Sequence, residues 1–282
     1  PESLMAAKAK TGSSIVETIK TIVYALLIAG VFRTLFFQPF WIPSGSMKET
    51  LLIGDFLFVN KMAYGYSYAS CPSVRIPAAG INIDAQKICG FIDGDNSRIL
   101  GGTPGRGDVA VFRHPVTGVD FIKRLIGLPG DTVQVKNGVL HVNGTAVALQ
   151  DAGEFEEVME RQGPAGSYPR CANGPVGQGG SCLKTRQIET LPGGTSHAIL
   201  NITDQGMDNT GVYHVPEGHY FFMGDNRDNS SDSRLPQTAG GVGFVPYENL
   251  IGRADRIMFS SAGRSMLFFW TWRGGRFFKA IE

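Results

Sequence analysis

The stretch GDVAVFRHPVTGVDFIKRLIGLPGD, residues 107–131, holds two short apolar runs separated by a polar turn. Residues 108–112 are rich in β-branched and apolar side chains, and residues 120–128 have the pattern of a second strand. The Pro-Gly-Asp that ends the stretch has the composition of a turn. The stretch therefore predicts β-structure, and it places Lys123 in a strand among apolar neighbours.

Runs of the same kind recur along the chain. Residues 55–59 and 219–223 are short, apolar and aromatic, and residues 132–142 contain Asn137-Gly138 between two alternating runs, which predicts a hairpin turn. Helical periodicity is scarce beyond the N-terminal segment, and residues 151–162 are the best candidate for a helix. We therefore predict a mainly β protein.

The N-terminal segment is predicted to be a membrane anchor. Residues 21–32 carry no charge, and the long side chains of Lys20 and Arg33 at either end can reach the lipid headgroups. With that allowance, residues 18–41 are long enough to cross a bilayer. Residues at the outer end are expected to form an aromatic belt and to stop the helix, namely Phe37, Phe40 and Trp41, and Pro39 and Pro43.

Two other interpretations of this segment fit less well. A cleaved signal peptide needs small residues after the apolar core, and the chain has Arg-Thr-Leu-Phe-Phe-Gln-Pro there. A buried helix of a soluble protein should carry polar residues at helical spacing, which residues 21–32 lack. Because Lys8, Lys10 and Lys20 precede the core, the positive-inside rule predicts a cytoplasmic N-terminus, residues 1–17, with everything after about residue 40 facing outward.

Composition narrows the class of protein. The formal net charge of +1 argues against nucleic acid as a partner. The 37 glycines and 15 prolines indicate many turns. About 240 residues follow the anchor, enough for one large domain or one domain with an insertion. The patterns weaken over residues 66–105 and 146–211, which we interpret as long insertions on a β core.

The four cysteines predict disulfides rather than a metal site. None sits in a Cys-x-x-Cys pair or near a histidine at ligand spacing, so neither zinc nor another metal is predicted. Cys171 and Cys182 bracket a Gly-rich loop that a disulfide would pin in an oxidising compartment, and this pairing is favoured. Cys71–Cys89 is its complement.

A serine and a lysine are the candidates for chemistry. A serine hydroxyl needs a base, and none of the five histidines falls in a triad motif; they are His114, His141, His197, His214 and His219. A lysine can serve if burial lowers its pKa, so Ser46, just past the anchor, and Lys123 form a candidate pair. The alternative is that Lys123 lies on the solvent face of its strand, with Arg124 turned inward.

The segment GDNRDNSSDSR, residues 224–234, is dense in short acceptors and also holds two arginines. It could be a polar surface loop or a calcium loop, but no glutamate stands at the closing position, and Arg227 and Arg234 bring positive charge. This composition favours a network of ion pairs and hydrogen bonds that supports a site.

Four blocks follow the anchor in order, and they carry a resemblance. They are residues 42–47 (IPSGSM); 52–55 (LIGD) with 61–65 (KMAYG); 106–109 (RGDV), 120–124 (DFIKR) and 127–131 (GLPGD); and 224–230 (GDNRDNS) with 232–234 (DSR), extended by 243–246 (GFVP) and 251–254 (IGRA). In this order they resemble the bacterial type I signal peptidases, or leader peptidases. The resemblance covers most of residues 40–135 and 219–256.

The resemblance implies a role for each matching residue. Ser46 matches the nucleophile and Lys123 the general base, while the backbone N–H of Ser46 and the hydroxyl of Ser44 would form the oxyanion hole. Ser230 would orient the lysine. The remaining matches are site support from Asp225, Arg227, Asp232 and Arg234, and substrate binding by Met47, Phe121 and Ile122. No cofactor is implied.

The resemblance also implies a fold of coiled antiparallel sheets with an inserted second β region. We expect the catalytic core in residues 42–145, with an insertion at about 66–105, and again in residues 212–260. Residues 146–211 would be the inserted region and residues 261–282 an aromatic, basic tail. Within that tail, residues 266–279 could form a core-packing strand with a solvated end or a contact with the membrane interface.

The activity implied is that of a membrane-anchored serine endopeptidase that removes signal peptides after small residues of the Ala-X-Ala type. Its partners would be secretory preproteins and the lipid bilayer, with no nucleic acid, and it would work as a monomer. It would lie in the bacterial inner membrane as a single-pass protein with the catalytic domain on the periplasmic face. The alternatives are a processing peptidase dedicated to one pilus or conjugation protein, and a non-catalytic membrane-anchored β-domain.

One other family test fails. A penicillin-binding enzyme would have Ser-x-x-Lys at the nucleophile, and Glu49 stands three residues after Ser46. A formal match at residues 181–184 falls in the Gly-rich loop region and is interpreted as accidental.

Overall fold

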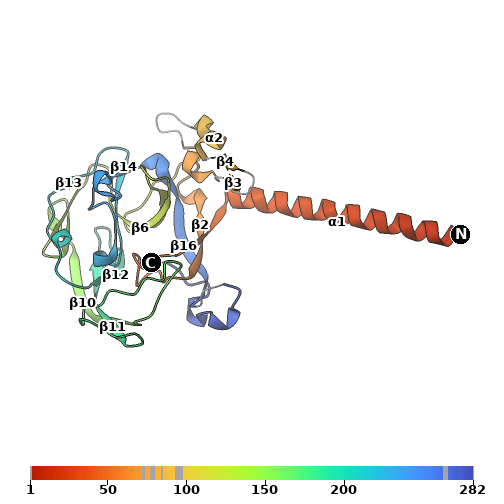
Figure 1. The fold of residues 1–282 in the computed structure, drawn as a ribbon. Helices are drawn as coiled ribbons and strands as arrows, with labels where there is room; N and C mark the ends of the chain where they lie inside the picture. The colour runs from red at the N-terminus through yellow and green to blue at the C-terminus, as the bar shows by residue number, and fades with distance from the viewer. Residues whose placement is uncertain are drawn as a thin grey trace.

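The computed structural model describes residues 2–71, 74–76, 80–83, 85–92, 98–262 and 266–281. A long helix, α1 (Glu2–Leu35), projects away from a β domain (Figure 1). Its segment Ser14–Phe32 is long and apolar enough to span a membrane, and none of that segment is buried by the protein. An apolar helix that the protein leaves uncovered fits the predicted anchor.

The helix ends earlier than the sequence suggested. Residues 37–41 form strand β1 (Phe37–Trp41), which pairs antiparallel with β2 (Asp55–Asn60), so a helical span up to Trp41 is wrong at its outer end. Pro39 cannot continue a helix, and the aromatic residues on either side suit a half-buried pleated surface. The chain therefore passes from helix to sheet within two residues of Leu35.

The main sheet has seven strands in the order β1-β2-β16-β5-β6-β14-β15. Its further strands are β5 (Val109–Arg113), β6 (Asp120–Gly127), β14 (His219–Met223), β15 (Val245–Pro246) and β16 (Leu250–Ser260). All neighbours pair antiparallel, and β16, which lies between β2 and β5, has register shifts in its pairing with both. The mainly β fold and the strands predicted within residues 107–131 are confirmed.

A second sheet contains the predicted hairpin. Its order is β13-β7-β8-β9, with β7 (Thr132–Lys136), β8 (Val139–Val142), β9 (Thr145–Ala146) and β13 (Tyr213–His214). Asn137 and Gly138 join β7 to β8 with φ of 49° and 76°, the left-handed conformation that an Asn-Gly hairpin turn requires.

The inserted region forms a sheet of its own, in the order β10-β11-β12. It consists of β10 (Ala148–Val158), β11 (Ser181–Thr190) and β12 (Ser196–Asn201), all antiparallel. The helix predicted over residues 151–162 is therefore wrong. Pairing with β11 along β10 outweighs the helix propensity of the glutamates, and Gly153, with φ of 81°, marks the register shift in the strand.

Both predicted disulfides are present. Cys71–Cys89 closes part of the first insertion, where β3 (Val74–Ile76) pairs with β4 (Ile81–Ile83) and α2 (Ala85–Cys89) follows. Cys171–Cys182 ties the Gly-rich loop to the start of β11, with the Cα atoms 5.1 Å apart.

The C-terminal tail forms no strand over residues 266–273. It has two 3₁₀ turns, Phe269–Thr271 and Gly274–Arg276, and Trp272 stacks on Phe259 of β16 with ring centroids 4.8 Å apart. The strand interpretation of this segment is wrong because isolated backbone bridges, Ser261 with Trp272 and Arg256 with Ala280, take the place of a continuous ladder, and the Arg276–Asp55 ion pair helps to dock the tail. Several other apolar side chains of the tail are exposed, including Leu267, Phe269 and Trp270.

The core places the loop after β1 firmly on the sheet. Met47 and Leu51, from the loop between β1 and β2, are fully buried and pack in one cluster with Leu57, Val111 and Ile122. Burying one side chain of this size stabilises the folded state by roughly 1.5–3 kcal/mol. The two buried residues therefore hold the loop against the sheet.

Removing the Cys171–Cys182 bond should lower stability. The disulfide closes a loop with a sequence separation of 11 residues. In the double variant Cys171→Ala/Cys182→Ala we expect the free energy of unfolding to fall by about 3 kcal/mol, chiefly because the unfolded chain gains freedom. Denaturant unfolding of the detergent-solubilised full chain measures it, and a loss below about 1 kcal/mol would contradict this account of the loop.

Candidate active site

Ser46 lies in a tight turn between β1 and β2. The backbone N–H of Lys48 donates to the carbonyl of Gly45 at 3.2 Å, and that of Leu51 donates to Met47 at 2.8 Å. The side chain of Ser46 is buried, with 8% of the residue exposed. The buried side chains of Met47 and Leu51, which follow Ser46, hold the turn in place. This restricts the movement of the serine hydroxyl.

Lys123 meets Ser46 from β6. Its Nζ donates to Ser46 Oγ at 2.6 Å and to the carbonyl of Ile122 at 3.2 Å. Lys123 is buried, with 4% exposed, and burial lowers the pKa of its ammonium to about 8, although the carboxylates of Asp232 and Asp225 act in the opposite direction. A lysine with this pKa is partly neutral near pH 8 and can accept a proton.

Lys123 and its neighbour Arg124 are both buried, so neither strand face points to water. Arg124 Nε and Nη2 donate to the two carboxylate oxygens of Asp225 at 2.9 and 2.8 Å, and Nη1 donates to the carbonyl of Gly107 at 2.8 Å. The alternative with Lys123 on the solvent face is wrong, because residues 122–127 of β6 are all buried and both faces of the strand are therefore covered. The ion pair compensates the second buried cation.

The segment after β14 supports the site with a second ion pair. Arg234 Nε and Nη2 donate to the Asp232 carboxylate, each at 2.9 Å, and the N–H of Gly224 donates to the same carboxylate at 3.0 Å. The opposing effect of burial is outweighed by Arg234, and the pKa of Asp232 stays below its ordinary value. These acids are held by arginine and backbone donors, as a supporting network requires.

The same segment also holds the turn directly. Asn226 donates from its side chain to the carbonyl of Gly45 at 2.8 Å and from its backbone to that of Ser46 at 3.1 Å. A Cβ on Gly224 would come within 2.3 Å of Ser230 Oγ and 2.6 Å of the Ser46 carbonyl. Position 224 therefore has space for glycine alone, and Ser230 adjoins the nucleophile turn.

The other residues predicted for the site are placed as follows. Ser44 is exposed, and its Oγ lies 3.5 Å from Ser46 Oγ. Ser230 Oγ is buried, and within the part of the chain that the structure describes it forms no hydrogen bond with Lys123, so the expected bond to the lysine is not formed here. Met47 and Ile122 are part of the core, and the Phe121 ring lies 5.5 Å from Lys123 Nζ.

Sequence reasoning missed a group that links the inserted sheet to the site. Arg227 donates to both oxygens of Glu189, from β11, at 2.9 and 2.5 Å. Burial raises the pKa of the Glu189 carboxyl, but the charge of Arg227 outweighs it and holds that pKa at about 2. His197, from β12, is buried, and its Nε2 lies 3.4 Å from the Glu189 carboxylate and 3.8 Å from that of Asp225.

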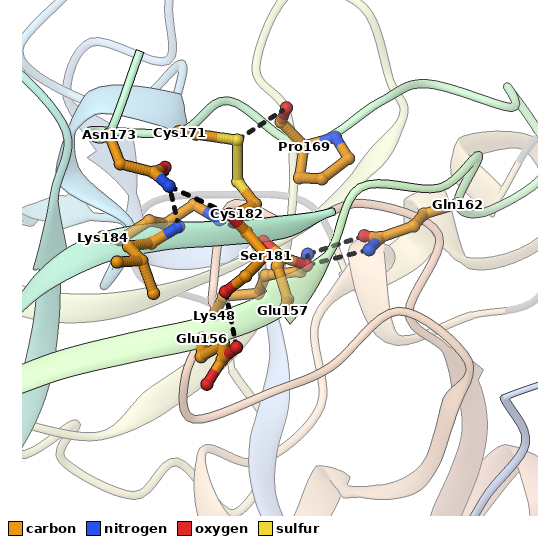
Figure 2. Close-up of a disulfide and its surroundings, with 11 residues drawn as sticks. Lys48, Glu156, Glu157, Gln162, Pro169, Cys171, Asn173, Ser181, Cys182 and Lys184 are labelled. Atoms are coloured by element: carbon orange, nitrogen blue, oxygen red, sulfur yellow. Dashed lines mark hydrogen bonds and ion pairs between the residues drawn. A yellow bond between two sulfur atoms is a disulfide. The ribbon is translucent and has the colours of Figure 1, made fainter. Parts of the chain in front are cut away.

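Lys48 was also missed. Its ammonium is buried and contacts Glu157 of β10 and Gln162 (Figure 2). No local pattern marks these residues, because Lys48 and Glu157 are 109 positions apart. Among the described residues, no group of three or more His, Cys, Asp or Glu side chains has the geometry of a metal site.

Comparison with known proteins gives one consistent family. The family described as "Signal peptidase, peptidase S26" matches residues 15–259. Signal peptidase I of Rickettsia typhi is 35% identical over 261 residues, covering 89% of this chain and 83% of the relative. Signal peptidase I of Rickettsia prowazekii is 36% identical over 247 residues, covering 84% and 78%. A solved structure of signal peptidase I from Enterococcus faecalis is 27% identical to this chain. The match covers 54% of this chain and 96% of the solved chain, with a TM-score of 0.28.

Because Glu189 is a buried carboxylate, the free energy of unfolding should depend on pH in the acidic range. Its folded pKa of about 2 lies below the ordinary 4.5, so the stability it contributes is complete above pH 4.5 and is lost as the pH falls toward 2. The variant Glu189→Gln should be less stable at neutral pH by about 3–5 kcal/mol, since it leaves Arg227 buried without its counterion. It should also lose less stability than the wild type between pH 4.5 and 2.

Denaturant unfolding at a series of pH values measures both effects. Glu154→Gln, which changes an exposed carboxylate of the neighbouring strand β10, is the matched control and should follow the wild type. Parallel acid profiles for wild type and Glu189→Gln would contradict the assignment.

Proposed function

This chain belongs to the signal peptidase I family, peptidase S26, and on that premise we propose that it removes signal peptides from preproteins with a Ser46–Lys123 dyad. The observation that carries the proposal is the 2.6 Å hydrogen bond between Lys123 Nζ and Ser46 Oγ, formed by a lysine whose pKa burial lowers to about 8. A peptidase nucleophile needs a base of this kind beside it.

The proposed reaction uses the dyad twice. Neutral Lys123 takes the proton of Ser46 as Oγ attacks the scissile carbonyl, and the resulting ammonium then gives that proton to the leaving amine. The negative oxygen that develops would be held by the N–H of Ser46 and the hydroxyl of Ser44, which lies 3.5 Å from Ser46 Oγ. Water then attacks the acyl-enzyme and gives a proton to Lys123. The ester bond to Ser46 Oγ breaks, the peptide leaves with a new carboxyl end, and Lys123 returns the proton to Oγ.

Substrate selection is proposed to follow from the packing around the turn. Met47 and Ile122 are nearly or fully buried, and Phe121 lies beside Lys123. Such close packing leaves room for small side chains at the −1 and −3 positions of the substrate. The cleavage region would add as a strand at a sheet edge, and β1 stands at one end of the strand order of the main sheet.

The proposed setting is a membrane surface. The apolar helix α1 fits a single-pass anchor, and we propose a cytoplasmic N-terminus with the catalytic domain, residues 42–260, on the outer face of the bacterial inner membrane. We further propose that the protein acts as a monomer and needs no cofactor. A non-catalytic β-domain would have no use for a buried lysine bonded to a serine. A processing peptidase for one pilus or conjugation protein is the second candidate.

Replacing either dyad residue should abolish cleavage. We expect Ser46→Ala and Lys123→Ala to lower the rate of cleavage of a model preprotein by at least about 100-fold, the range that a general base contributes. Lys136→Ala changes an exposed lysine of the β7–β8 hairpin and should cleave like the wild type. Gel-shift assays on purified protein in detergent measure this, and activity in Lys123→Ala near the wild-type level would rule out the dyad.

The same assay can separate a general from a dedicated enzyme. Cleavage of several unrelated preproteins with small residues at −1 and −3 is expected. Cleavage of a single pilin-like substrate alone would support the dedicated processing peptidase.

The pH dependence should report the lysine. Because protonated Lys123 cannot accept a proton, kcat/KM is expected to rise as the pH increases through about 8 and then level off. His197 cannot explain such a limb, since burial lowers the pKa of its ring below the ordinary 6.5. An acid limb centred near pH 6, or one near the ordinary lysine value of about 10.4, would contradict the assignment.

A further inference from the structure

Lys48 is a second buried lysine beside the nucleophile, and the proposed reaction does not use it. The residue is 5% exposed and lies two positions after Ser46. Its aliphatic chain runs back along the turn, where Cε comes within 3.2 Å of the place that a Cβ on Gly45 would occupy. A buried ammonium is unfavourable unless it is paired, so its partner carries the argument.

That partner is Glu157, whose carboxylate is shared between two lysines. One oxygen of Glu157 accepts from Lys48, and the other accepts from Lys184 of β11, which is 1% exposed (Figure 2). Gln162 completes the group, accepting from Lys48 at 2.6 Å and donating to Glu157 at 2.8 Å. Although burial acts against it, the Lys48 charge lowers the pKa of the Glu157 carboxyl, which keeps it ionised.

The group is fixed to the inserted sheet. Glu157 lies opposite Cys182 in the pairing of β10 with β11, and Cys182 forms the disulfide with Cys171 (Figure 2). Lys184 stands two residues further along the same strand. The carboxylate that accepts from Lys48 is therefore fixed by the pairing of β10 with β11, and it lies beside the Cys171–Cys182 disulfide.

One side of the turn borders a cavity of about 750 Å³. The lining of this cavity includes Lys48, Leu52 and Ile53 as well as residues 155–158 and 160–164. On the opposite side Asn226 binds the carbonyls of Gly45 and Ser46. Lys48 therefore connects the turn to the inserted sheet.

We propose that Lys48 is a positioning residue for the reaction, whose ion pair with Glu157 holds the 44–48 turn so that Ser46 Oγ meets Lys123 and the Ser44 hydroxyl. The inserted sheet is then part of the catalytic apparatus. The inference rests on the proposed function. It predicts an effect on the chemical step, because a nucleophile displaced by about 1 Å loses rate on the order of 100-fold while substrate binding is unchanged.

The test is a kinetic comparison of the full-length protein. Lys48→Met keeps the length of the side chain and leaves Glu157 paired with Lys184, so it should fold. We expect kcat to fall about 10- to 100-fold, KM to change less than about 2-fold, and the acid limb to stay near pH 8 because Lys123 is intact. Lys48→Arg keeps the charge and should restore most of kcat.

A double-mutant cycle ties the effect to the pair. Glu157→Gln should also lower kcat, and Lys48→Met/Glu157→Gln should be no worse than the poorer single variant if the two residues act together. Glu156→Gln is the matched control, because this neighbouring carboxylate is exposed and bonds Ser181 instead. Should Glu157→Gln fail to fold, since it leaves two buried ammonium groups, Lys48→Met and Lys48→Arg still decide the question.

Three outcomes would overturn the inference: wild-type kcat in Lys48→Met, a loss that Lys48→Arg does not restore, and additive losses in the cycle. These are distinct from failure of the dyad. If Ser46→Ala is inactive and Lys48→Met is fully active, only the role of Lys48 is wrong; if Ser46→Ala or Lys123→Ala stays active, the proposed function itself is wrong.

Discussion

The surrounding structure depends on one constraint, the burial of a lysine ammonium against a serine hydroxyl. Lys123 has its pKa lowered by burial, and a nearby unpaired carboxylate would reverse this by favouring the charged form. Three buried acids of the site are matched to arginines: Asp225 to Arg124, Asp232 to Arg234 and Glu189 to Arg227. The result is a buried, highly charged region in which Lys123 contacts the hydroxyl of Ser46.

Some of this arrangement could be predicted from the sequence, where the signal is local. The alternating β-branched runs within residues 107–131 predicted β5 and β6, and Asn137-Gly138 predicted its hairpin, because period and turn chemistry act over a few residues. Residues 151–162 failed for the opposite reason: the pairing of β10 with β11 is non-local and outweighs local propensity.

The candidate site divides in the same way. The residues alone suggested the pairing of Ser46 with Lys123, and the resemblance strengthened it, but the residues left Lys123 and Arg124 competing for one buried position. Period-two alternation cannot predict that both are buried, because it assumes that one face of the strand is wet. Glu189 and Glu157 lie in the inserted region, 38 positions from Arg227 and 109 positions from Lys48, so no spacing in the sequence points to these two contacts.

The exposed helix α1 has a consequence for kinetics. Because no residue of Ser14–Phe32 is buried, and its contact with the β domain is at Phe32, whose ring lies 6.0 Å from that of Phe37 in β1, the helix adds little to the free energy that holds the domain together. Under the proposed function, the membrane helix provides confinement instead: enzyme and membrane-bound preprotein would search for each other by lateral diffusion in a thin layer, at a raised effective concentration. Stability and encounter frequency are thus set by separate parts of the chain, so each can change without altering the other.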